Sequence, residues 1–167
     1  MLKRAQSTVR ENSAYKHRLR IAGIALAGVF GFLIGVAILC ATHPEWGLHS
    51  AFSSVCHQQP HRSHKMDGVP LGVCIRCFWL YVGLFLGHGR FVFCHTIPNS
   101  RVLLLGIAVT LGALDWGSGW ITPTGNPVWL RMTTSIVIGI SVSHFTVSPL
   151  AKWVYQENQT RKNKHKS

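Results

Sequence analysis

The sequence has few charged residues, and acidic residues are the scarcest of all. Charged residues make up 13% of the 167 positions, with 5 acidic side chains against 17 lysines and arginines. An average soluble domain is about 25% charged. This shortage argues against an ordinary soluble domain, and two long apolar runs point the same way. Ile21 to Thr42 and Met132 to Ala151 contain no charged residue.

Four segments are apolar enough to cross a bilayer, since about 20 helical residues span ~30 Å of hydrocarbon. We predict an all-α membrane protein, a four-transmembrane-helix bundle occupying residues 21–154, with spans at about 21–42, 69–87, 102–121 and 128–151. The first run is long for the core of a cleaved signal sequence, so we expect it to remain as a helix. The basic tails 1–20 and 155–167 are polar throughout, and we expect them to be disordered.

The basic residues are distributed unevenly around these spans. Arg62 and Lys65 lie on one side, whereas thirteen lie before the first span, after the last, or between the second and third. The positive-inside rule then predicts a multi-pass protein of the plasma (inner) membrane with both termini in the cytoplasm. The tails show no alternation of aromatic and basic residues, so the net charge of +12 does not indicate nucleic-acid binding. The expected partner is the lipid bilayer.

Small residues recur four positions apart in every span, a spacing that lets helices approach closely in lipid. The positions are Ala27, Gly31 and Gly35; Gly83 and Gly87; Ala108 and Gly112; and Ser135, Gly139 and Ser143. Such faces predict close helix contacts within the bundle. They also suit a homo-oligomer or a partner in a membrane complex.

The ionisable residues within the spans fall at one depth. Counting 1.5 Å per residue from the outer boundary places Cys74 and Cys77 roughly 7 to 12 Å deep, with Arg76 between them. Asp115 lies ~10 Å and Arg131 ~5 Å from the same boundary on their own helices. Ionisable groups inside a membrane usually face the helix bundle and pair with one another. We therefore expect Asp115 to lie between the two arginines, beneath the loop that carries Cys56 and His57.

These residue types indicate a metal site. Zinc takes four ligands from cysteine and histidine, and Cys56, His57, Cys74 and Cys77 supply that number. Further candidate ligands are His61, His64 and Asp115. Candidate catalytic groups are Asp115, Tyr81, Arg76 and Arg131. Zinc is the expected ion, but the sequence does not decide whether the protein is an enzyme.

Two alternatives use the same cysteines without a metal. Cys74 and Cys77 form a C-x2-C pair that can cycle between dithiol and disulfide outside the cytoplasm. The layout resembles quinone-linked disulfide-forming membrane enzymes, but a second cysteine pair is missing because Cys56 is alone in its loop. In the other alternative Cys56 forms a structural disulfide with Cys74 or Cys77, and the protein is a subunit of a transporter or membrane assembly.

Several short motifs resemble a family of small integral membrane proteins of bacteria and archaea, known only as a domain of unknown function. The matching positions are Cys56-His57-Gln58, Arg62-Ser63, Cys74-x-Arg76-Cys77 and Tyr81-x-Gly83, followed less specifically by Asp115, Asn126, Arg131 and Thr134. The resemblance covers roughly residues 50 to 140. It implies a membrane fold and a polar site but no reaction. Trp79 stands where the family tends to have glycine, and His64 stands where an aromatic residue usually follows Arg-Ser.

Overall fold

The structure is a computed structural model that describes residues 2–93, 101–121 and 126–164, without the side chains of 2–15, 61, 101, 119–121, 148 and 150–164. Four helices account for most of these residues: α1 (Leu2–Thr42), α2 (Ile75–Phe93), α3 (Arg101–Ile121) and α4 (Val128–Lys164). Between α1 and α2 the chain forms three short 3-10 helices and one hairpin. These are η1 (Pro44–Trp46), η2 (Leu48–Phe52), η3 (Pro60–Arg62), β1 (Lys65–Met66) and β2 (Val69–Pro70). The all-α fold class is thus confirmed.

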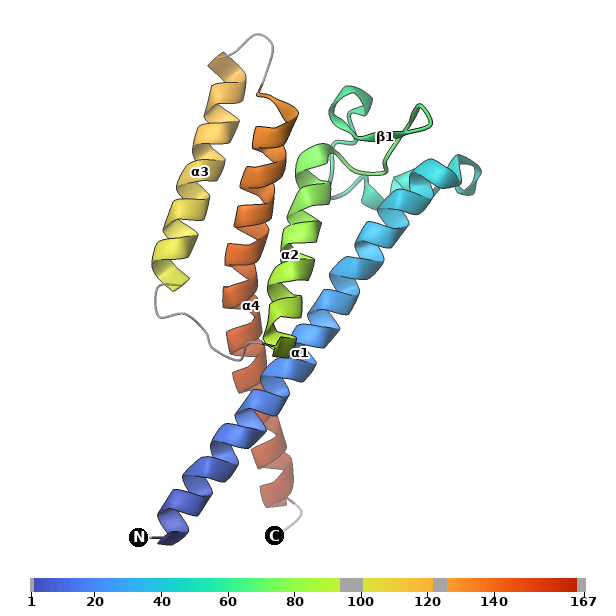
Figure 1. The fold of residues 1–167 in the computed structure, drawn as a ribbon. Helices are drawn as coiled ribbons and strands as arrows, with labels where there is room; N and C mark the ends of the chain where they lie inside the picture. Colours follow the sequence, from blue (N-terminus) through green and yellow to red (C-terminus); the bar gives the residue numbers. More distant parts are fainter. Residues whose placement is uncertain (1, 94–100, 122–125, 165–167) are drawn as a thin grey trace.

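The helices lie in the order α3, α4, α2, α1, with the two chain ends at one end and the η and β segments at the other (Figure 1). The most extensive contact joins α2 and α4, and α1 packs on α2 and also crosses α4. α3 packs mainly on α4, and among the described residues its backbone makes few close approaches to α1 or α2, although the side chains of Arg76 on α2 and Asp115 on α3 form an ion pair. The arrangement is therefore more open than the compact bundle expected from the sequence.

Glycine explains why α2 and α4 lie so close together. A Cβ atom at Gly83 would lie 2.5 Å from the Ile136 carbonyl oxygen, and one at Gly139 would lie 2.6 Å from the Leu80 carbonyl oxygen. At Gly87 an added Cβ would collide with Ser143. The close approach that the small-residue spacing predicted is confirmed for this helix pair. At Gly35 of α1, by contrast, an added Cβ would meet nothing within 4 Å.

The helix in the region of the second predicted span begins later than expected. Asp67 and Gly68 both have positive φ, 50° and 85°, which is the geometry of a type I′ hairpin turn. This turn pairs Lys65 with Pro70 and Met66 with Val69, so the backbone of 69–70 belongs to a hairpin and not to a helix. α2 consequently starts at Ile75 and continues to Phe93.

The tails that we expected to be disordered are helical where the structure describes them. α1 extends back to Leu2 and α4 extends to Lys164. Neither 2–20 nor 150–164 contains glycine or proline, and adding a residue to an existing helix is far easier than starting one. At 41 residues, α1 is about 60 Å long, roughly twice the thickness of the hydrocarbon layer.

Two stretches of the described helices, Lys16–Thr42 and Val128–Val147, are long and apolar enough to cross a membrane, and Val102–Ser118 is a shorter apolar stretch. α2 carries Arg76, His88 and Arg90 within its length. Large apolar side chains nevertheless cover the outside of the helices. Examples are Ile24, Val29 and Phe32 on α1 and Val102, Leu103, Val109 and Leu114 on α3, all more than half exposed. A lipid environment would cover such a surface.

Candidate functional site

Three thiols meet at the end of the molecule that carries the η and β segments. Cys56 follows η2, Cys74 immediately precedes α2, and Cys77 lies in the first turn of α2. Their three Sγ atoms lie within 4.8 Å of one another. Among the described side chains, this is the cluster of cysteine, histidine or acidic residues that could hold a metal ion. All three are free thiols; Cys56 is buried, and the other two are partly exposed.

Backbone contacts fix the positions of the thiols. The amide of Cys74 donates a hydrogen bond to Cys56 Sγ over 3.2 Å. Gln58, which has a positive φ of 48°, donates from Nε2 to the carbonyl oxygens of His49 and Gly72, the latter over 3.0 Å. Gln58 thereby ties the loop of Cys56 to the residues that lead into Cys74. The Cys-His-Gln motif therefore has a structural reason for its third member.

Cys40 belongs to the apolar support of this site. It is fully buried in a cluster with Ala37, Phe52, Cys56 and Val73. A Cβ on Gly72 would lie 2.6 Å from Cys40 Sγ. Only glycine therefore fits at position 72, where the chain packs against Cys40 on its way to Cys74. Cys40 therefore packs as an apolar side chain beneath the three thiols.

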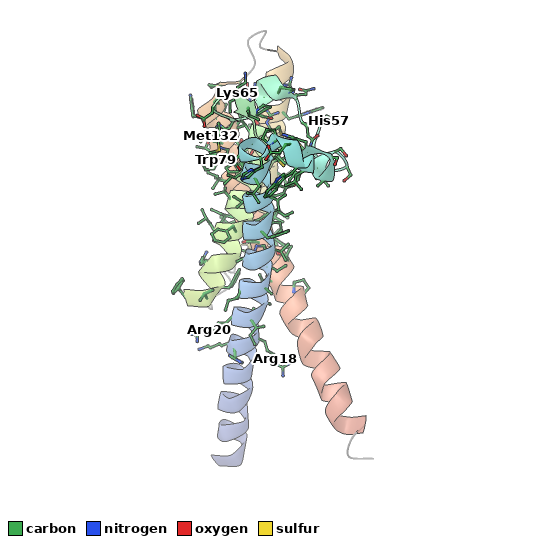
Figure 2. All side chains as sticks on the ribbon, turned by 90° about the vertical axis from the view of Figure 1, so that its right-hand side faces the viewer. Arg18, Arg20, His57, Lys65, Trp79 and Met132 are labelled. Atoms are coloured by element: carbon green, nitrogen blue, oxygen red, sulfur yellow. The ribbon has the colours of Figure 1, made fainter. Side chains whose placement is uncertain are left out.

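A pocket of about 320 Å³ opens beside the thiols. Its lining contains the three cysteines, His57 and three arginines, Arg62, Arg76 and Arg131, together with Val55, Gln59, Ile75 and Trp116. Figure 2 shows His57, Trp79 and Met132 at this end of the molecule, far from Arg18 and Arg20. The pocket joins the η loops to the first turns of α2 and α4.

Asp115 lies behind the pocket in a network of hydrogen bonds. Arg76 approaches its Oδ2 with Nη2 at 2.7 Å and Nε at 2.9 Å. Asn126 donates from Nδ2 to Asp115 Oδ1 over 2.6 Å and to the Asp115 carbonyl oxygen over 2.5 Å. Both carboxylate oxygens are therefore occupied, and Asp115 is 5% exposed. The expected pairing is confirmed for Arg76 and Asp115. In contrast, Nε of Arg131 is buried and has no hydrogen-bond partner among the described residues.

The remaining candidate residues are placed around this centre. His57 is exposed at the pocket wall, outside the sulfur cluster. His64 accepts a hydrogen bond on Nε2 from Trp79 Nε1 over 2.9 Å. The Tyr81 ring packs against the apolar cluster around the cysteines and stacks on Phe30 with the ring centres 6.3 Å apart. The side chain of His61 lies outside the described residues.

Sequence reasoning missed two features. Arg62 belongs to the Arg-Ser motif, but nothing in that motif indicates that its side chain lines a pocket. His88 lies just after the predicted second span, but α2 continues beyond it, and its side chain is completely buried. His88 Nδ1 lies 2.6 Å from the Leu84 carbonyl oxygen and Nε2 lies 2.7 Å from Thr146 Oγ1, so both ring nitrogens are satisfied between α2 and α4.

Comparison with known proteins places the chain in a family of predicted membrane proteins. It is 29% identical over 115 residues to an uncharacterised protein of Methanocaldococcus jannaschii, covering 66% of this chain and 72% of that protein. No solved structure matches. The family described as "Predicted membrane protein (DUF2085)" matches residues 56–145, which include the three thiols, the arginines of the pocket and Asp115. The chain belongs to this membrane-protein family, as its motifs predicted.

Proposed function

We propose that Cys56, Cys74 and Cys77 bind zinc or a similar divalent ion at the outer face of the membrane. The observation that carries this proposal is the approach of the three Sγ atoms to within 4.8 Å of one another. Around a zinc ion with bonds of about 2.3 Å, tetrahedral sulfurs lie about 3.8 Å apart. Small adjustments of the side chains would close that difference.

The surroundings favour thiolates, which are the form that binds metal. Cys74 and Cys77 lie at the N-terminal end of α2, where the helix dipole stabilises negative charge. The amide hydrogen bond to Cys56 Sγ acts in the same direction. The three sulfurs leave a fourth position on the side of the pocket, where His57 or a small ligand completes the coordination.

Metal analysis of the full-length protein, purified in a neutral detergent, tests this proposal. We expect about one equivalent of zinc in the unmodified protein and its loss from Cys56→Ser, Cys74→Ser and Cys77→Ser. Cys40→Ser is the matched control, because Cys40 is also a buried free thiol but packs beneath the cluster. Absence of stoichiometric metal, or metal content unchanged in Cys74→Ser, would contradict the proposal.

The same thiols support a second candidate, thiol–disulfide exchange between Cys74 and Cys77, because a disulfide would need movement of only a few ångströms. Thiol-trapping gels separate the two functions. A metal site predicts thiols that are blocked by alkylating reagents only after a chelator removes the ion. A redox site predicts a disulfide that appears and disappears with the oxidant supplied, without any effect of chelator.

A further inference from the structure

The pocket beside the thiols is strongly cationic. Arg62, Arg76 and Arg131 line it, and its wall contains no acidic side chain from the part of the chain that the structure describes. Asp115 neutralises Arg76 from behind, with the two charged groups 2.7 Å apart. Arg62 and Arg131 form no ion pair among the described residues.

Arg131 is the residue of the pocket whose positive charge an anion would stabilise most. Its Nε is buried without a hydrogen-bond partner. Its charged neighbours include two other cations, Arg76 and Arg62, together with Asp115, whose oxygens are already occupied by Arg76 and Asn126. Arg131 is partly exposed at the pocket, so an anion there could reach its guanidinium and offset the repulsion from the neighbouring cations.

The net charge of the pocket is positive with protonated thiols and also with thiolates that hold a divalent ion. Three arginines and one carboxylate give +3 − 1 = +2 when the thiols are protonated. A divalent ion bound by three thiolates adds 2 − 3 = −1 and leaves +1. An anion is therefore favoured with or without the metal, so this inference does not require the metal site.

The donors approach the pocket from three elements. Arg62 ends η3, Arg131 lies one turn inside α4, and the first residues of α2 belong to the lining of the pocket. The amides in the first turn of a helix have no carbonyl partner in their own helix. A helix N-terminus flanked by two guanidinium groups suits an oxyanion with several acceptor atoms better than a planar carboxylate held by one arginine.

We propose that this pocket binds a phosphate group between Arg62 and Arg131, next to the three thiols. The phosphate can come from a soluble compound or from a lipid headgroup. The lining also contains the apolar side chains of Val55, Ile75 and Trp116, and Trp116 is 63% exposed. These side chains can contact the organic part of a soluble phosphate compound or the acyl chains of a lipid.

Isothermal titration of the full-length protein in a neutral detergent tests the proposal with two probes, inorganic phosphate and short-chain phosphatidylglycerol. We expect saturable binding of at least one probe, weakened roughly tenfold or more in Arg131→Gln and in Arg62→Gln, because each loses a charge-assisted hydrogen bond. Arg62 is exposed on a loop, so its substitution leaves the fold intact even if the Arg131 variant does not fold.

The control is Lys65→Gln, an exposed cation near the same loop that does not line the pocket (Figure 2). Binding of phosphate alone assigns a soluble ligand, and binding of the lipid alone assigns a headgroup. Unmodified protein stripped of metal by a chelator separates this inference from the metal proposal, since it should contain no metal but retain phosphate binding. Failure of both probes to bind, or binding unchanged in both arginine variants, would overturn the inference.

Discussion

Trp79 and His64 are the two positions at which the chain departs from the motifs it resembles, and they contact each other. Trp79 Nε1 donates to His64 Nε2 over 2.9 Å, and the His64 ring also meets Phe78 edge-on. Each departure therefore supplies a partner for the other. The hydrogen bond occupies the Nε2 atom of His64, which leaves this histidine as a support of the loop in the observed arrangement.

The ion pair of Arg76 and Asp115 gives a prediction about stability. Asp115→Asn should lower the free energy of unfolding by about 2 kcal/mol, because Arg76 keeps its charge but loses its carboxylate partner. Thermal unfolding in detergent measures the change.

A double-mutant cycle separates this pair from general damage to the network. The combined Arg76→Gln and Asp115→Asn variant should be less destabilised than the sum of the single variants, because it leaves neither charge unpaired. Strict additivity would show that the two side chains do not stabilise each other.

Counting residues along helices predicted which groups share a depth, but not which way they face. Depth alone brought Arg76 and Asp115 together, and the structure pairs them. The same count predicted that Arg131 would also pair with Asp115, whereas Asn126 donates to the second carboxylate oxygen. The direction of a side chain around its helix depends on how the helices pack, and no count along one chain contains that information. The arginine-lined pocket could not be predicted for the same reason.

At the scale of elements, the hairpin before α2 decides where the thiols lie. The Asp67-Gly68 turn directs residues 65–70 into two short strands, and the Leu71 amide donates to the His64 carbonyl oxygen over 2.8 Å. Cys74 therefore lies immediately before the first residue of α2. The Asp-Gly pair was a readable hairpin signal in the sequence, but the apolar residues that follow it favoured a longer helix.

The contact of α2 with α4 gives a prediction about a single methyl group. Gly83→Ala should destabilise the protein by about 2 kcal/mol, because the new Cβ would meet the backbone of Ile136, which cannot move without separating the helices. Gly89→Ala is the matched control in the same helix, since a Cβ there meets nothing within 4 Å. The two variants are compared by thermal unfolding, and equal melting temperatures would contradict the packing described for α2 and α4.

At the scale of the molecule, the two ends differ in chemistry. The end with the hairpin carries the thiols, the pocket and the arginines that line it. At the other end, Arg18 and Arg20 lie on α1 just before Ile21, where the uncharged run begins, on the side where both chain ends lie (Figures 1 and 2). Membership of a membrane-protein family and the exposed apolar surfaces of α1 and α3 indicate that the helices lie in a lipid environment. The number of spans and their orientation remain predictions from the sequence.

Fusion proteins test that orientation. Thirteen basic residues on the side of the termini against Arg62 and Lys65 on the other predict that the termini stay in the cytoplasm. In a bacterial host, alkaline phosphatase fused after Met66 should be active, because this enzyme folds only outside the reducing cytoplasm. The same enzyme fused to the C-terminus should be inactive, whereas a green fluorescent protein fused there should fluoresce.

Neutralising Lys16, Arg18 and Arg20 together should raise the phosphatase activity of the C-terminal fusion, because it weakens the charge bias that holds the N-terminus inside. Phosphatase activity at the C-terminus of the unmodified protein would invert the topology and place the three thiols in a reducing compartment, where disulfide chemistry is disfavoured and metal binding is the remaining use for the cluster.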